Sequence, residues 1–258
     1  MIKMKKLILK KKPIVCLTAY NKFSAEIVDE FCDLILVGDS LGMAYYGFSS
    51  TRFVSLSDII RHGKSVRMGV KKAIMVVDMP YGTYKNKTIA IKNAKKIIKE
   101  TKCDAVKLEG GSEISSIIKA LIKNKINVMG HIGLLPQKIN SPKNYKVKGK
   151  NSQEITKLIK DLLNLQNAGV FSLVLEAVKL HGASEIMKKA KIPVIGIGAS
   201  KYCDGQILVL EDMLGFFEKV PRFVKKYANL RDQIKKAVKK YSIEVKNKKF
   251  PGKNNLYL

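Results

Sequence analysis

Acidic side chains follow several apolar runs of this sequence, at the point where each run ends. The run from Leu34 to Val37 is followed by Asp39 and Ser40, and the run from Ala73 to Val77 ends in Asp78. Runs of this kind are typical of strands buried in a parallel sheet, and ligands bind at the carboxyl ends of such strands. The ends of later runs add further polar or small residues, namely Lys107, Glu109, His131, Glu176, Gly198 and Ser200.

Carboxylates that converge on one small space repel each other and stay ionised only when they share a cation. Oxygen ligands alone favour a hard ion, and Mg²⁺ is the one we expect. Lys107 and Glu109 are two residues apart, so their side chains lie on the same face of their strand. If that face is the interior of a barrel, Lys107 supplies a fixed positive charge that suits a substrate carboxylate.

Each of these residues also has a structural interpretation when it is taken alone. Asp39 could cap a helix or hold a turn, Asp78 precedes Met79-Pro80 and could form a turn, and Glu109 could belong to a loop. His131 could be a structural hydrogen-bonding residue. The repetition of polar residues at successive strand ends is what favours a functional site.

Strand-like and helical segments alternate along the whole chain. The pattern predicts strands at residues 14–20, 34–38, 73–78, 105–109, 127–132, 172–177, 193–197 and 206–210, and helices at 21–31, 55–68 with Ser57 as N-cap, 88–101, 112–124, 152–168 and 183–190. A long loop at 133–150 has the length of a functional lid. Eight such units in 258 residues predict an α/β fold, a (β/α)8 TIM barrel that forms one domain over residues 1–258.

The C-terminal segment 221–249 differs from the rest and is expected to form an amphipathic helical extension. Its apolar residues fall at steps of three and four on a very basic background: Phe223, Tyr227, Leu230, Ile234, Val238 and Tyr241. Such a stripe could lie on an anionic membrane. Packing on the barrel or on a partner subunit is the interpretation that we favour.

Composition and charge restrict the class of protein. Apolar residues make up 46% of the chain, no apolar run is long enough to span a membrane, and Met1 to Lys12 does not have the pattern of a signal peptide. The four cysteines show no paired spacing, so we expect free thiols and a cytoplasmic protein. The net charge of +28 raises nucleic-acid binding as an alternative. We favour a solvated surface because lysines are dispersed and no recognition motif is present.

The strand-end motifs resemble one family of enzymes over residues 14 to 251. The matching segments are LILVGDSLGM, VVDMPYGTY, AVKLEGG, VMGHIGLLPQ, YKVKGK, LVLEAV, IPVIGIGAS and CDGQILVLEDMLG. In this order they are similar to ketopantoate hydroxymethyltransferases, also called 3-methyl-2-oxobutanoate hydroxymethyltransferases. The GDSLGM and VKLEGG motifs are the specific ones, whereas IPVIGIGA alone fits many barrels.

The resemblance implies a (β/α)8 barrel, a homo-oligomer of decamer size and a reaction in pantothenate and coenzyme A biosynthesis. That reaction moves a hydroxymethyl group from 5,10-methylenetetrahydrofolate to 2-oxoisovalerate by way of an enolate that Mg²⁺ stabilises, and it gives 2-dehydropantoate and tetrahydrofolate. By the same resemblance Asp39, Asp78 and Glu109 are expected at the metal, and Glu176 is expected to be the catalytic base. The expected substrate contacts are Asp39, Ser40, Asp78, Lys107, His131 and Ser200.

The nearest alternative is another Mg²⁺-dependent barrel that makes or breaks C–C bonds of an α-keto acid, such as an isocitrate lyase-like enzyme. It would use similar acids. The sequence has no reactive cysteine in a KKCGH-type loop, which argues against that branch.

Overall fold

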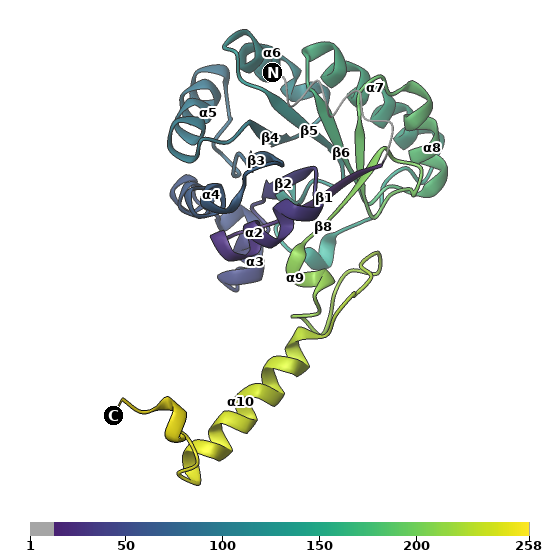
Figure 1. Cartoon of the computed structure of the whole chain (residues 1–258). Coiled ribbons are helices and arrows are strands. Elements are labelled where there is room, and N and C mark those ends of the chain that lie inside the picture. Colours follow the sequence, from purple (N-terminus) through teal and green to yellow (C-terminus); the bar gives the residue numbers. More distant parts are fainter. Residues whose placement is uncertain (1–12, 258) are drawn as a thin grey trace. The chain divides into compact units, whose positions relative to one another are not determined.

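The structure, a computed structural model, describes residues 13–257, and the strands within this range form a closed parallel barrel (Figure 1). Each strand pairs in parallel with the next one along the chain, and the last strand pairs with the first to close the barrel. The prediction of a (β/α)8 barrel is therefore confirmed. The strands are β1 (Ile14–Thr18), β2 (Leu34–Val37), β3 (Ile74–Asp78), β4 (Ala105–Glu109), β5 (Val128–Gly133), β6 (Ser172–Glu176), β7 (Val194–Ile197) and β8 (Gly205–Leu208).

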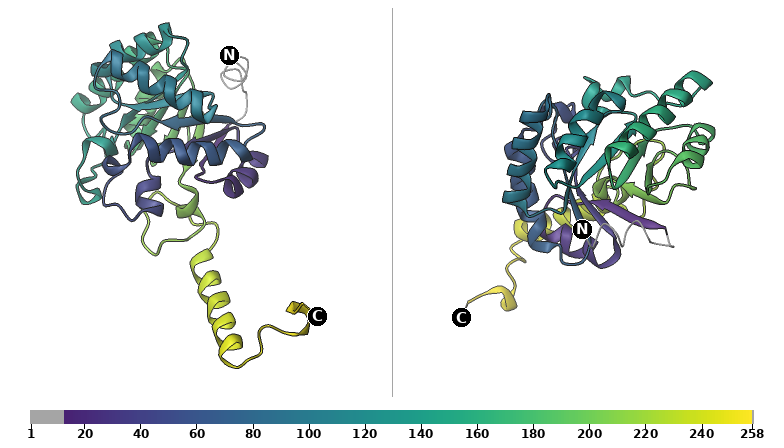
Figure 2. Two further views of the ribbon diagram at one scale, coloured as in Figure 1. Left: turned by 90° about the vertical axis from the view of Figure 1, so that its left-hand side faces the viewer. Right: turned by 90° about the horizontal axis from the view of Figure 1, so that it is seen from above.

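Helices cover the outside of the strands, as the views in Figures 1 and 2 show. Neighbouring helices also contact one another in chain order. They bury one apolar face against the barrel and leave lysines on the other face. These helices are α2 (Lys22–Phe31), α4 (Leu56–Gly69), α5 (Lys87–Thr101), α6 (Ser115–Lys123), α7 (Ser152–Ala168) and α8 (Leu180–Lys189), and the short α3 (Leu41–Tyr45) follows β2.

The barrel interior is filled by apolar side chains that alternate along the strands. Ile74 and Val76 of β3 belong to this core, and so do Ala105 of β4, Met129 of β5 and Val174 of β6. Side chains two residues apart in a strand lie on the same face. The next inward positions after these core residues are therefore the polar ones: Asp78, Lys107, Glu109, His131 and Glu176. The core consequently aims these side chains into the mouth of the barrel.

Several element boundaries differ from the predicted ones. The N-cap of α4 is Ser55 and not Ser57, because Ser55 and Asp58 form a reciprocal capping box at that end. The predicted helix 112–124 is divided, with a 3-10 turn at Ser112–Ile114 before α6. The helix predicted to begin at residue 183 already begins at Leu180. The predicted strand 206–210 ends at Leu208, because Leu210 opens the short helix α9 (Leu210–Met213).

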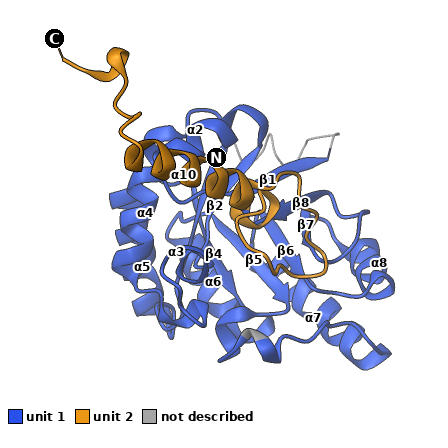
Figure 3. Ribbon diagram, turned by 90° about the horizontal axis from the view of Figure 1, so that it is seen from below, with its two compact units in different colours: residues 1–209 blue, residues 210–258 orange. Residues whose placement is uncertain are grey.

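The chain divides into two compact units, residues 1–209 and residues 210–258 (Figure 3). The second unit contains α10 (Leu230–Lys246), which is shorter than the predicted extension 221–249. Phe223 and Tyr227 lie before the helix. The N–H of Tyr227 donates to Met213 O and the N–H of Leu230 donates to Leu214 O, so these groups do not form hydrogen bonds within a helix. Within α10 the apolar stripe is exposed at Ile234, Val238 and Tyr241.

The remaining predictions about the class of protein concern the membrane, the thiols and the N-terminus. In the described part of the chain no helix has the length and apolar character that a membrane span requires. All four cysteines are buried, and they lie outside disulfides, as predicted. The prediction that Met1 to Lys12 is not a signal peptide lies outside the described residues.

A buried carboxylate connects α2 to the entry of β3. Asp29 accepts hydrogen bonds from the backbone N–H groups of Lys71, Lys72 and Ala73 at 2.8–3.0 Å. Burial raises the pKa of this carboxyl, but the backbone hydrogen bonds outweigh burial and hold its pKa below the usual 3.8. The turn before β3 therefore depends on one charged side chain.

We expect Asp29→Ala to lower the free energy of unfolding by about 1.5–3 kcal/mol, the range for a lost hydrogen bond to a charged group. Because the folded pKa is lowered, the stabilisation is present above pH ~4 and declines as the pH falls below that value. Urea unfolding at pH 7 and at pH 3.5 measures both effects. The neighbouring exposed acid provides the control variant Glu30→Ala. Equal stability of the two variants at pH 7 would contradict this role for Asp29.

Candidate active site

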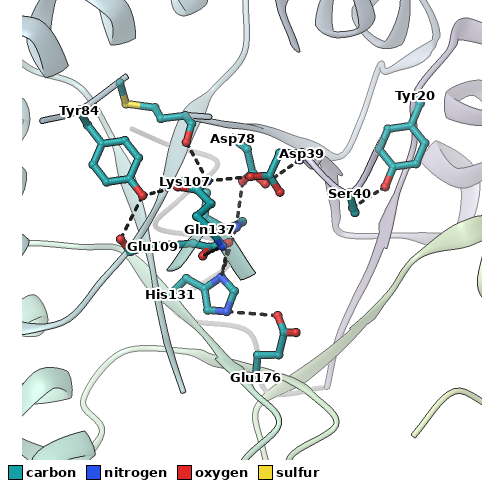
Figure 4. Close-up of polar contacts among 11 residues, drawn as sticks. Tyr20, Asp39, Ser40, Asp78, Tyr84, Lys107, Glu109, His131, Gln137 and Glu176 are labelled. Atoms are coloured by element: carbon teal, nitrogen blue, oxygen red, sulfur yellow. Dashed lines mark hydrogen bonds and ion pairs between the residues drawn. The ribbon is translucent and has the colours of Figure 1, made fainter. Parts of the chain in front are cut away.

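Two acids meet at the carboxyl ends of β2 and β3. Asp39 and Asp78 are 4% and 2% exposed, and the backbone N–H of Asp39 donates to Asp78 Oδ2 at 3.0 Å. The other oxygen, Asp78 Oδ1, lies 3.0 Å from the ammonium of Lys107 on the next strand (Figure 4). The strand register thus brings two acidic side chains and one ammonium together, and all three are buried.

Lys107 and Glu109 both point into the barrel, as the sequence predicted for residues on one face of a strand. Lys107 Nζ also lies 3.3 Å from His131 Nδ1. An ammonium only donates hydrogen bonds, so Nδ1 accepts and the ring proton is on Nε2. That nitrogen lies 3.3 Å from Glu176 Oε2. His131 therefore connects the ammonium of Lys107 to the carboxylate of Glu176, as Figure 4 shows.

The charges of the site shift one another's pKa values. Burial, followed by repulsion from Asp78, raises the pKa of Asp39 to about 7. Burial and the charge of Asp39 raise the pKa of Glu109 well above its usual range. For Lys107, burial alone would lower the pKa, but the nearby carboxylates raise it above its usual value. Burial and the charge of Lys107 lower the pKa of His131, which keeps its ring neutral at pH 7.

Gln137 is a site residue that the sequence prediction did not include. It is 2% exposed and lies in a 3-10 turn, Pro136–Lys138, within the long loop after β5. Its Nε2 donates to Asp39 Oδ2 at 2.7 Å and to Met79 O at 3.1 Å, and its backbone N–H donates to Glu109 Oε2 at 3.0 Å. The available signal was its place at the end of the motif VMGHIGLLPQ.

Tyrosines complete the polar surroundings of the acids. The hydroxyl of Tyr84 donates to the carbonyl of Glu109 at 3.1 Å and contacts Gln137 Oε1. Tyr145, in the same long loop as Gln137, is half-buried, and burial followed by the charge of Glu176 raises the pKa of its hydroxyl. The loop that the sequence suggested as a lid therefore supplies two polar groups to the site.

The two predicted serines differ in their surroundings. Ser40 Oγ forms a 2.7 Å hydrogen bond with the hydroxyl of Tyr20, beside Asp39 (Figure 4). Ser200 is buried, but its hydroxyl accepts from the N–H of Tyr202 and its carbonyl accepts from Gln206. These contacts lie within the connection between β7 and β8. The structure thus groups the other predicted site residues and leaves Ser200 in its own turn.

The acids at β2 and β3 fit a divalent cation. Asp78 Oδ1 is buried without a hydrogen bond and forms an ion pair with Lys107. Burial and mutual repulsion raise the pKa values of Asp39 and Glu109, and a cation bound beside them would favour the ionised form of these carboxylates. Within residues 13–257 no group of three or more His, Cys, Asp or Glu side chains is placed to hold an ion. Asp39 and Asp78 would therefore leave coordination positions for substrate oxygens and water.

Three sequence relatives cover nearly the whole chain. All three are called 3-methyl-2-oxobutanoate hydroxymethyltransferase, numbered 2 in the second case. The relative from Pelagibacter ubique is 55% identical over 96% of this chain and 95% of its own length. Those from Zymomonas mobilis and Bartonella quintana are 51% and 47% identical, over 96% and 95% of this chain and 91% and 90% of their own lengths.

Solved structures of lower identity share the fold. Phosphoenolpyruvate phosphomutase from Streptomyces platensis is 13% identical with a TM-score of 0.63, over 95% of this chain and 87% of its own. A phosphonopyruvate hydrolase complex with oxalate and Mg²⁺ is 10% identical with the same TM-score, over 100% of this chain and 91% of its own. A 2,3-dimethylmalate lyase, described as a PEP mutase/isocitrate lyase superfamily member, is 11% identical with a TM-score of 0.62, over 97% and 85%.

The solved structures, which include a relative of the lyase-like alternative, thus share the barrel with this chain but only 10–13% of the sequence. The hydroxymethyltransferases share 47–55% of the sequence over nearly the whole chain. The sequence profile described as ketopantoate hydroxymethyltransferase matches residues 1–253. This chain therefore belongs to the ketopantoate hydroxymethyltransferase family, a family of hydroxymethyl-transferring enzymes.

Proposed function

We propose that this enzyme transfers a hydroxymethyl group from 5,10-methylenetetrahydrofolate to 2-oxoisovalerate, giving 2-dehydropantoate and tetrahydrofolate for pantothenate biosynthesis. The observation that carries the proposal is the group of ionisable side chains at the ends of β2 to β6, all buried except the partly exposed Glu176: Asp39, Asp78, Lys107, Glu109, His131 and Glu176. An α-keto acid brings a keto oxygen and a carboxylate to this group. Its neighbouring carbon, C3, carries the proton that must be removed.

Asp39 and Asp78 are the residues that would hold Mg²⁺. The ion, when bound, supplies a Lewis acid that polarises the keto carbonyl and makes the C3 proton more acidic. Support comes from the phosphonopyruvate hydrolase of the same fold, which is described in complex with oxalate and Mg²⁺. Glu109 is directed towards Gln137 and His131, so we place it in the outer shell, where it orients Gln137.

Lys107 and Ser40 are proposed to bind the keto acid. The ammonium of Lys107 lies deep in the barrel between Asp78 and His131, and its fixed charge can also attract the substrate carboxylate. The hydroxyl of Ser40 lies at the adjacent strand end. Ser200 is proposed to contact the substrate from the turn after β7.

Glu176 is proposed to remove the C3 proton. It is the least buried acid of the group, with a side chain 14% exposed, and it faces the neutral ring of His131. The Nε2–H of His131 can hydrogen-bond the carboxylate and hold it in place. Carbon C3, once deprotonated, attacks the methylene carbon of the folate. Water enters the overall reaction, and tetrahydrofolate leaves.

We expect Asp39→Asn and Asp78→Asn each to weaken Mg²⁺ binding by more than about tenfold, because even the loss of an outer partner typically costs 10- to 100-fold. Glu109→Gln should have a smaller effect than either. Isothermal titration with Mg²⁺ and no substrate measures the affinities, and circular dichroism checks the fold. The exposed acid Glu30 provides the control Glu30→Gln. Unchanged affinity in both aspartate variants would remove the ion from these residues.

Glu176→Gln keeps the shape of the side chain but lacks its basicity. We expect it to bind Mg²⁺ and 2-oxoisovalerate normally and to slow C3 exchange into deuterated water by about 10²–10⁴-fold, the usual contribution of a general base. NMR without folate follows the exchange, and Glu113→Gln tests an exposed acid outside the proposed machinery. Wild-type exchange would exclude Glu176 as the base. A simultaneous loss of Mg²⁺ binding would place it at the metal instead.

We also propose a cytoplasmic homo-oligomer of decamer size without nucleic-acid or membrane partners. The exposed apolar stripe of α10 supports the oligomer, and four buried cysteines outside any disulfide support the cytoplasmic location. Analytical ultracentrifugation of the whole chain is expected to give a species much larger than the 28.8 kDa monomer. The double variant Ile234→Ser/Val238→Ser should reduce that size if the stripe lies in an interface. A monomer for the unchanged chain would contradict the proposal.

A further inference from the structure

The residue after Glu176 has an unusual backbone conformation. Ala177 has φ = 49°, in the left-handed region that side chains with a Cβ rarely adopt. It is 7% exposed and is neither glycine nor asparagine, the residues that tolerate this region. A conformation of this kind persists only where surrounding contacts impose it.

Hydrogen bonds from three directions impose the conformation. The N–H of Ala177 donates to Ile197 O of β7 at 2.9 Å, which continues the strand pairing beyond Glu176. The carbonyl of Glu176 accepts from the N–H of Leu134 at 2.9 Å, and the carbonyl of Ala177 accepts from the N–H of Lys148 at 2.8 Å. The chain from Glu176 to Ala177 is therefore fixed on both sides.

The same contacts define a strap, residues 134–148, that begins and ends at the backbone of Glu176 and Ala177. Lys148 also accepts from the N–H of Lys179, so the end of the strap is held twice. Next to the start of the strap, Gly133 packs against the Glu176 backbone so closely that an added Cβ would lie 2.3 Å from Glu176 O. The strap also carries Gln137, which donates a hydrogen bond to Asp39. The same segment therefore contacts both the backbone at Glu176 and the side chain of Asp39.

We propose that Ala177 is a positioning residue whose strained backbone, clamped by the strap, aims the Glu176 carboxylate at the substrate. The inference rests on the proposed role of Glu176 as the base. The Cβ of Ala177 narrows the range of backbone angles available next to Glu176. A glycine there would adopt φ = 49° without strain, and it would also allow many other angles.

The proposal predicts opposite effects of Ala177→Gly on stability and on activity. In Ala177→Gly, relief of strain should raise the Tm by about 2–4 °C. The looser backbone should lower kcat and the rate of C3 exchange about 10- to 100-fold, the effect of a misplaced catalytic group. The KM for 2-oxoisovalerate should stay within about twofold, because the substrate contacts are on other strands. A merely structural left-handed turn predicts higher stability with unchanged kcat.

Two further variants serve as controls. Lys102 is exposed, has φ = 55° at the end of α5 and is not part of the site, so Lys102→Gly should raise the Tm without changing kcat. Ala177→Ser retains a Cβ and should retain most of the activity. Wild-type kcat and exchange in Ala177→Gly would overturn the proposal. A fall in its Tm would also overturn it, since the Cβ would then stabilise through packing and not through strain.

Glu176→Gln is measured in the same assays to separate the two proposals. Slow exchange in Glu176→Gln together with normal exchange in Ala177→Gly would retain the base and reject the positioning role. Normal exchange in Glu176→Gln would instead reject the proposed function of Glu176 itself, and the positioning role would fall with it.

Discussion

The site depends on the contact between the ammonium of Lys107 and the buried carboxylate of Asp78. Two adjacent carboxylates in a dry interior repel each other, and burial of each one is unfavourable by itself. Lys107 offsets part of this repulsion at 3.0 Å and at the same time directs the lone pair of His131 Nδ1 towards itself. Its charge thus determines the tautomer of the ring that faces Glu176. One cation consequently organises both the acids at β2 and β3 and the acid at β6.

Barrel geometry explains why such a charged group can form at all. The apolar layers below the site are made by Ile74, Val76, Ala105, Met129 and Val174, and they exclude water from the lower part of the barrel. The polar side chains are placed directly above them by the alternation of the strands. The apolar packing therefore stabilises the barrel enough to offset the unfavourable burial of this layer of charged side chains. Fold and chemistry depend on the same two-residue periodicity.

That periodicity is also why much of the site could be predicted from the sequence. The position of a residue in a strand determines the face of the sheet and the end of the barrel at which its side chain lies. Asp78, Lys107, Glu109 and His131 were therefore expected together, and the structure brings them together. Gln137 was missed because it lies in a 3-10 turn of a long loop, where no periodicity indicates direction. The left-handed backbone at Ala177 was equally invisible, since the sequence there has no glycine to signal it.

The helix boundaries were likewise predictable where local residues determine them and not where contacts between distant residues do. The span of α7, residues 152–168, was predicted to the residue, because Asn151 caps its start and Gly169 ends it in the left-handed conformation. The segment before α10 was predicted as helix, since its apolar spacing continues the stripe. Backbone hydrogen bonds of Tyr227 and Leu230 to residues 213–214 prevent this. Such pairings between distant residues leave no trace in local spacing.

The closed path of the strap has a consequence for how this enzyme can vary. One end of the strap is bonded to Glu176, the last residue of β6, and the other end to Ala177, so changes in the length of its middle part need not shift Glu176. Closing a longer loop costs little additional entropy, about 0.6 kcal/mol for each doubling of its length. Ile139 and Asn140 are held by hydrogen bonds from Ser50 and Arg52, whereas the hydrogen bonds of residues 141–144 are local, so insertions between residues 141 and 144 are expected to be tolerated. The length of the strap can therefore change there while the backbone at Glu176 keeps its hydrogen bonds.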